Sequence, residues 1–370
     1  MNDQIWVATR KGVFEILRSK AGWRIAKVHF PAQNASMVLH DRRDGALYAA
    51  LGHGHFGVKL HRSLDGGVKW EEIKAPAYPP KPEGEEWKTW GGKPVPYNLE
   101  LVWELAAGGA DEPGTVWCGT IPGGLFRTRD RGDSWDLIES LWNHPSRTKW
   151  FGGGAEFPGI HSVRVHPKDS RHVTVGISCA GIWITRDGGA TWTNDGKGMR
   201  AEFVPPEHAY SMVVQDPHLL VQSPADPKVL WVQHHNGMFR SGDGGANWTE
   251  ITDVKPSVFG FAVAAHPKER DTAWFVPAQK DEHRVPVSGQ VVVTRTRDGG
   301  KSFETLRKGL PQEHAYDLVF RHGLDVDGSG NRLAFGSTTG SLWVSEDQGD
   351  SWQTVSEHLP PVYCVRFGKG

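Results

Sequence analysis

Cysteine is scarce in this sequence, and neither a long apolar run nor an excess of one charge sign is present. The 370 residues include three cysteines, at positions 118, 179 and 364, and an odd number argues against a disulfide framework. Basic and acidic side chains number 42 and 43, for a net charge of −1. We therefore expect neither nucleic acid nor a membrane surface as a partner.

The N-terminal residues lack a charged segment followed by an apolar stretch. No run of residues approaches the length that spans a bilayer. The sequence therefore predicts no signal peptide and no membrane span, and we expect a cytoplasmic location.

Glycine and tryptophan are abundant, with 45 and 17 residues, and they recur in one eight-residue phrase. The clearest copy, residues 185–192, reads TRDGGATW, and the pattern S/T-x-D-x-G-x-x-W/F occurs six times. A worn seventh copy at 19–23 lacks the aspartate. The aspartates of the six copies are Asp65, Asp130, Asp187, Asp243, Asp298 and Asp347. The aromatic ends lie 47 to 65 residues apart, a period that indicates a propeller or a solenoid.

Each residue of the phrase suits a tight turn. An aspartate at the head of a turn accepts hydrogen bonds from the backbone N–H groups that follow it. The glycine two positions on adopts a positive φ without steric cost, and the closing aromatic ring packs beneath the hairpin. These aspartates are therefore interpreted as structural rather than catalytic.

Between these turns the sequence contains short stretches typical of β-strands, four in each repeat unit, separated by glycine and proline. Residues 4–29 hold only three runs, at 5–8, 12–17 and 23–28, and the chain ends with a single run at 361–367. Pairing that last run with the first unit would close a ring and leave no open sheet edge around it. The sequence therefore predicts one all-β domain over residues 1–370, a seven-bladed β-propeller of four-stranded antiparallel blades.

The repeated phrase resembles the Asp-box, or BNR repeat, of sialidases, sortilin-type receptors, xyloglucanases and a photosystem II assembly factor. The resemblance covers nearly the whole chain and implies a β-propeller. It does not imply one activity, because the family includes hydrolases, receptors and scaffolds.

The sialidase pattern of catalytic residues is not found. The resemblance implies an early Arg-Ile-Pro motif, whereas the nearest match, residues 283–286 (HRVP), lies deep in the chain. Sialidases have six blades and xyloglucanases two large propellers, so no catalytic residue is transferred from either. Whether the protein is an enzyme stays open.

The longest loops and the unusual residues lie on the face opposite the Asp-box turns, here called the decorated face. Loops on a rigid scaffold are a common place for binding sites. On this face we predict ligand-binding residues in two histidine-rich loops, in a long connection and at the start of inner strands. They are His53, His55, Trp150, His161, Tyr210, His218, His234, His235, Asn236 and Tyr316.

Aligning the blades on Pro167, Pro224 and Pro267 places His161, His218 and Phe261 at one position, at the start of the innermost strand. A looser alignment places Glu100 and Asp317 near the same spot. Imidazoles and carboxylates together can bind a divalent metal ion and activate water, so His161, His218, Glu100 and Asp317 are candidate ligands. The alternative is a set of hydrogen-bonded polar residues that line a water-filled channel.

The tetrapeptide EHAY occurs twice, at 207–210 and 313–316. Its Glu207–His208 and Glu313–His314 pairs are candidates for general acid–base catalysis. They can equally be a packing device repeated between blades. Cys179 is either a nucleophile or a small buried thiol.

Two hypotheses of different class follow. In the first, the decorated face binds a small polar, carbohydrate-like ligand at a histidine-rich channel mouth, with metal-assisted hydrolysis or lyase chemistry as an extension. In the second, the same face is a non-catalytic scaffold that holds a protein partner. The first requires a pocket where the histidines converge, and the second a flat apolar surface.

Overall fold

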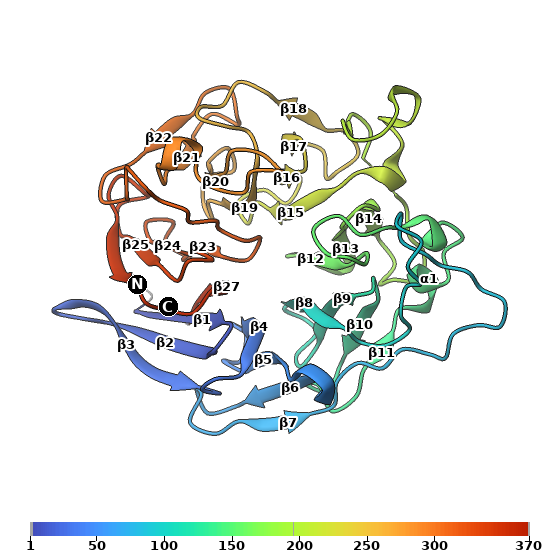
Figure 1. The fold of residues 1–370 in the computed structure, drawn as a ribbon. Coiled ribbons are helices and arrows are strands. Elements are labelled where there is room, and N and C mark those ends of the chain that lie inside the picture. Colours follow the sequence, from blue (N-terminus) through green and yellow to red (C-terminus); the bar gives the residue numbers. More distant parts are fainter. Residues whose placement is uncertain (1–2, 195, 369–370) are drawn as a thin grey trace.

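A computed structural model describes residues 3–194 and 196–368. Its strands form seven antiparallel sheets arranged in a ring, with a few short helical turns in the connections (Figure 1). The predicted fold, a seven-bladed β-propeller, is confirmed.

Six blades have four strands. The first comprises β1 (Gln4–Thr9), β2 (Gly12–Ser19), β3 (Gly22–His29) and β27 (Val362–Phe367). The second comprises β4 (Asn34–His40), β5 (Leu47–Gly52), β6 (Val58–Ser63) and β7 (Glu71–Ile73). The third comprises β8 (Leu101–Ala107), β9 (Val116–Ile121), β10 (Leu125–Thr128) and β11 (Asp136–Leu137). The fifth comprises β15 (Pro217–Gln222), β16 (Leu230–His234), β17 (Gly237–Ser241) and β18 (Thr249–Ile251).

The sixth blade comprises β19 (Gly260–Ala265), β20 (Ala273–Pro277), β21 (Val293–Thr296) and β22 (Glu304–Leu306). The seventh comprises β23 (Leu324–Val326), β24 (Leu333–Gly336), β25 (Leu342–Ser345) and β26 (Gln353–Ser356). The fourth blade has three strands, β12 (Ile160–His166), β13 (Asp169–Ile177) and β14 (Gly181–Thr185). A single bridge between Ile184 and Thr193 stands in place of its outer strand. The connections hold α1 (Glu139–Trp142) and the 3₁₀ turns η1 (Gly54–Phe56), η2 (Arg147–Lys149), η3 (Pro206–His208), η4 (Met212–Val214) and η5 (Val287–Gly289).

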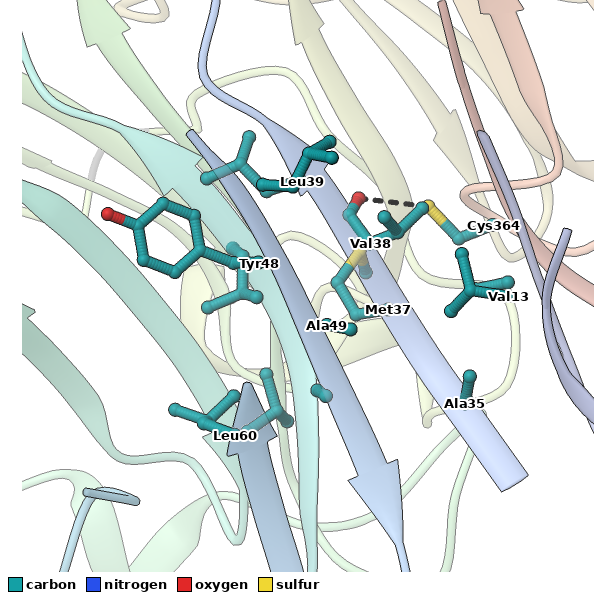
Figure 2. Packing of buried hydrophobic residues seen from close by; sticks show 14 of the residues in the cluster. Val13, Ala35, Met37, Val38, Leu39, Tyr48, Ala49, Leu60 and Cys364 are labelled. Carbon is teal, nitrogen blue, oxygen red and sulfur yellow. Dashed lines mark hydrogen bonds between the residues drawn. The ribbon is translucent and has the colours of Figure 1, made fainter. Parts of the chain in front are cut away.

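The ring closes as predicted, through β27. This strand pairs antiparallel with β1, with Val7 opposite Val365. On its other side β27 packs on the second blade, where the Cys364 thiol lies 3.6 Å from the carbonyl oxygen of Val38 (Figure 2). The chain ends are therefore held together by both β-pairing and side-chain packing.

The six aspartate turns share one set of hydrogen bonds. In the copy at 185–192, Asp187 Oδ1 accepts from the backbone N–H of Thr191 at 2.9 Å and from Thr185 Oγ1 at 2.7 Å. The equivalent backbone bond is present at 2.9–3.0 Å in the other five copies. Two consecutive residues after each aspartate have positive φ, and in two copies the first is Arg131 or Gln348 rather than glycine. The turn chemistry expected from the sequence is thus present six times.

These carboxylates are expected to make the fold acid-sensitive. Hydrogen bonding from Ser302 lowers the pKa of Asp298 to about 2. Burial raises the pKa of Asp130, but hydrogen bonds from Ser134 and Thr128 outweigh it and bring the value to about 2. Since an unfolded aspartate titrates near about 3.9, the stabilisation is complete above about pH 4 and is lost as the pH falls toward about 2.

Urea unfolding followed across this pH range measures the effect. The midpoint of the wild-type chain is expected to fall as the pH is lowered, and Asp298→Asn is expected to fall less steeply. Asp253→Asn, at an exposed site outside the turns, is the control and keeps the wild-type slope. Equal slopes for all three proteins would contradict the assignment.

Candidate functional site

The inner strands surround the centre of the ring, and two cavities lie along it. The cavity on the decorated face has a volume of about 300 Å³, and the one toward the Asp-box face about 340 Å³. Arg321 and His322 line both cavities, so they lie between the two mouths. The decorated-face cavity is walled by Trp103, Phe320 and Tyr363.

A β-bulge sits near the start of the inner strand in six blades. The pairing shifts register around one residue in β4, β8, β12, β15, β19 and β27. The residues left out of register are Ser36, Trp103, His161, His218, Phe261 and Tyr363. A bulge re-aims the side chain that it carries, which is how the sheet presents these residues at one level of the channel.

The position at which the sequence alignment places His161, His218 and Phe261 is therefore the bulge of the inner strand. In the third blade this position belongs to Trp103, three residues after Glu100. The bulged residues also touch across blades: the rings of His218 and Phe261 stack with centroids 4.4 Å apart, and those of Trp103 and His161 meet edge-on at 5.4 Å.

Asp216, His218 and His235 form a polar cluster near this level. Asp216 Oδ2 lies 3.6 Å from His218 Nε2 and 3.4 Å from His235 Nδ1. The other carboxylate oxygen accepts hydrogen bonds from Ser178 Oγ at 3.0 Å and from the Cys179 backbone N–H at 3.2 Å. Asp216 and His218 are buried, whereas a quarter of the His235 side chain is exposed.

Burial and pairing act in opposite directions on the two histidines. Burial lowers the pKa of His218 and so favours its neutral form. Burial also disfavours the charged form of His235, but its contact with Asp216 outweighs that effect and raises the pKa of His235. The pKa of Asp216 is well below the usual range, because contacts with the histidines and the charge of Arg321 outweigh its burial. The surroundings therefore favour the charged form more at His235 than at His218.

Arg321 is a buried cation with few polar contacts. Its side chain lies between Trp103 and Phe261, with the guanidinium carbon 4.8 Å and 5.3 Å from the two ring centres. Among the described residues, neither Nε nor Nη2 of Arg321 has a hydrogen-bond partner. Burial lowers its pKa to about 10, so the group is still charged at neutral pH.

The three consecutive glycines at 152–154 let the chain pass close to both groups. A Cβ on Gly153 would lie 2.7 Å from the Asp216 carboxylate, and one on Gly154 would collide with the Arg321 guanidinium. The Gly154 N–H donates to Ser178 Oγ at 3.3 Å. The absence of side chains here leaves room for Arg321 and Asp216 on either side of one loop.

The structure brings some predicted residues together and places others elsewhere. His218 and His235 meet Asp216, and His161 is buried close enough for the charges of Arg321 and Asp216 to act on its pKa, which burial holds far below its usual value. His234 is buried behind the cluster and accepts the Asp216 N–H at 3.0 Å, while Asn236 accepts the Glu202 N–H at 3.4 Å.

The other candidate metal ligands have different partners. Glu100 accepts a hydrogen bond from the Asn98 side chain at 2.5 Å, and Asp317 accepts one from Ser337 Oγ at 2.7 Å. The group of possible ligand atoms found among the described residues contains Asp216, His218 and His235, so it shares only His218 with the predicted set.

The remaining predicted residues lie in the surrounding loops. His53 and His55 lie at η1 in the second blade, and His55 packs on Phe56 with ring centres 4.1 Å apart. Trp150 is fully buried, and its carbonyl oxygen accepts from Trp87 Nε1 at 3.0 Å.

In the duplicated tetrapeptide, the buried residue is the alanine, and its neighbours are exposed. Ala209 and Ala315 are buried, whereas Tyr210 and Tyr316 are about two-thirds exposed. The exposed acid–base candidates are Glu207, His208, Glu313 and His314. Cys179 is buried beside Asp216, and burial raises the pKa of its thiol well above the usual value, which disfavours a thiolate nucleophile.

Asp216 and Arg321 are absent from the candidates predicted from the sequence. Asp216 could have been found from the spacing Asp-Pro-His ahead of β15. Arg321 belongs to no motif, and only the three-dimensional arrangement reveals its position.

Comparison with known proteins identifies the fold and not a family. No protein-family model matches the chain, and the search of curated proteins gave no match. An ancestral GH74 enzyme superposes with a TM-score of 0.59 at 15% identity over 87% of this chain, which spans only 38% of that enzyme's length. YCF48 bound to D1 peptide superposes with a TM-score of 0.53 at 14% identity, over 87% of this chain and 84% of its own.

A protein of unknown function from Desulfotomaculum acetoxidans gives a TM-score of 0.59 at 8% identity, over 99% of both chains. At such identities these likenesses establish a shared propeller fold alone. Among the described residues, no helix has the length and apolar character needed to cross a bilayer.

Proposed function

We propose that this protein binds a small polar ligand with a carboxylate group in the decorated-face cavity. The observation that carries the proposal is Arg321, a buried guanidinium with two nitrogens that lack a hydrogen-bond partner among the described residues. Unpaired buried donors are costly. A carboxylate satisfies them in pairs, because guanidinium and carboxylate match in a bidentate geometry.

The walls of the cavity favour a carbohydrate-like acid. Phe320 and Tyr363 stack with ring centres 6.1 Å apart, and Trp103 adds a third aromatic wall. Aromatic faces pack well on the apolar face of a sugar ring, and a volume of about 300 Å³ is at the lower end of the usual range for small-molecule sites. A uronic acid combines a ring of this kind with the carboxylate that Arg321 would bind.

Isothermal titration with glucuronate, galacturonate and glucose tests this proposal. The two uronates are expected to bind, and glucose at least about tenfold more weakly, since a hydrogen bond to a charged group contributes about 1.5–3 kcal/mol. Arg321→Gln is expected to remove the preference for the acids. Arg297→Gln, at an exposed site in an Asp-box turn, is the control. Absence of uronate binding, or equal binding by Arg321→Gln, would overturn the proposal.

A protein partner on the same face is the second candidate function. Trp90, Tyr210 and Tyr316 are each about two-thirds exposed in the connections of this face. YCF48, a structural neighbour, was solved with a bound peptide. Trp87 and Trp150, in the same connections, are buried and do not contribute to this surface. In the titration above, a pure scaffold binds none of the three small molecules.

A further inference from the structure

Asp216, His218 and His235 together have the geometry of a metal-binding triad. With bonds of about 2.1 Å, the ligand atoms of a tetrahedral zinc ion lie about 3.4 Å apart. Asp216 Oδ2 is 3.6 Å from His218 Nε2 and 3.4 Å from His235 Nδ1, and all three atoms lie within 4.8 Å of one another. Two of the three separations are therefore close to those between ligands of one ion, and the third is bounded at 4.8 Å.

The hydrogen bonds around the triad point the right atoms inward. His218 Nδ1 lies 2.7 Å from the carbonyl oxygen of Gly260. A carbonyl oxygen only accepts, so Nδ1 carries a proton, and Nε2 is the ring atom that faces Asp216. At 3.6 Å, Nε2 and Asp216 Oδ2 are too far apart for a hydrogen bond, and a cation between them would contact both.

The other two ligands are oriented in the same way. His235 Nε2 lies 4.0 Å from Asp281 Oδ2, an outer carboxylate of the kind that commonly supports a metal-bound histidine. Ser178 and the Cys179 N–H bind Asp216 Oδ1 and leave Oδ2 for an ion. Asp216 and His218 thus each have a second hydrogen bond that orients them, whereas His235 has Asp281 as a charged neighbour.

We propose that Asp216, His218 and His235 bind one divalent transition-metal ion, with zinc preferred over magnesium. Two imidazoles and one carboxylate favour a transition metal, whereas Mg²⁺ prefers oxygen ligands. Three protein ligands leave a coordination position for water or a ligand atom. His235, which is partly exposed and packs against Phe203 at 4.8 Å between ring centres, marks the side from which the ion enters. The site stands independently of the uronate proposal.

Metal analysis and titration of protein purified without an affinity tag test this site. The wild-type chain is expected to bind about one equivalent of Zn²⁺, which Mg²⁺ does not displace. Asp216→Asn and His235→Gln are expected to weaken Zn²⁺ binding at least about tenfold, and Asp281→Asn by less, because its carboxylate lies 4.0 Å from His235 Nε2. His358→Gln, at an exposed histidine far along the chain, is the matched control.

Two further measurements keep the result interpretable. Far-ultraviolet circular dichroism establishes that each variant is folded, and His235→Gln is the safest variant because His235 is partly exposed. Arg321→Gln is expected to keep the zinc stoichiometry even where it loses uronate binding. Sub-stoichiometric zinc in the wild-type chain, or unchanged affinity in both ligand variants, would overturn the metal site and leave the uronate proposal standing.

Discussion

Deleting residues 361–370, and with them β27, is expected to prevent the whole ring from folding. Val362, Val365 and Phe367 are fully buried among residues of the first and seventh blades. At about 1.5–3 kcal/mol for each apolar side chain, their loss removes an amount comparable to the net stability of a typical domain, about 5–15 kcal/mol. The deletion also removes the partner of β1 and exposes an open sheet edge.

Soluble yield, size-exclusion chromatography and circular dichroism measure this effect. A synthetic peptide of residues 359–370, added during refolding, is expected to restore a monomeric folded species, because it supplies the missing strand and the Cys364 contact with the second blade (Figure 2). A truncated chain that stays soluble and melts cooperatively near the wild-type temperature would show that the ring does not depend on its closing strand.

This closure could be predicted because it follows from counting. Each Asp-box turn is built from contacts within a few residues, such as Thr185, Asp187 and Thr191. Each copy can therefore be recognised in the sequence. The N-terminal unit contains three strands and the C-terminal end of the sequence contains one, so pairing the two completes a four-stranded blade. The observed pairing of β27 with β1 follows that count.

The candidate site was less accessible to sequence reasoning because it depends on bulges and on contacts between blades. The alignment of His161 with His218 fixed their height along the strand, and both lie at bulges. It could not show that Asp216 and His235 meet His218, since this requires the path of two loops. Glu100 shows the limit of the alignment. It lies near the level of the bulged residues along the inner strand, but its carboxylate accepts a hydrogen bond from Asn98.

Replacement by methionine is expected to change the free energy of unfolding differently at two buried arginines. Arg147 donates to both oxygens of Glu85 at 2.7 and 2.8 Å and lies over the ring of Trp142 at 4.2 Å. It thereby ties the long connection after β7 to the segment that follows α1. Arg147→Met removes the buried partner of a partly buried ion pair and its two hydrogen bonds to a charged group, so it is expected to cost about 1.5–3 kcal/mol.

Arg321→Met is expected to leave the free energy of unfolding unchanged or to raise it. Its guanidinium lies between two aromatic rings, and methionine packs well in such a place. Asp216, the nearby carboxylate that its charge acts on, keeps its bonds from Ser178 and Cys179. We expect a ligand-binding residue to be of this kind, a buried charge that contributes little to the stability of the fold.

Equilibrium urea unfolding of the two variants and the wild-type chain compares the two roles directly. Similar slopes with denaturant establish that the midpoints report stability rather than a change in the unfolded state. If Arg321→Met were as destabilising as Arg147→Met, Arg321 would be a structural cation, and the main support for a carboxylate ligand would be gone. If only Arg147→Met is destabilising, the charge of Arg321 is not needed for folding, as expected of a residue that binds a ligand carboxylate.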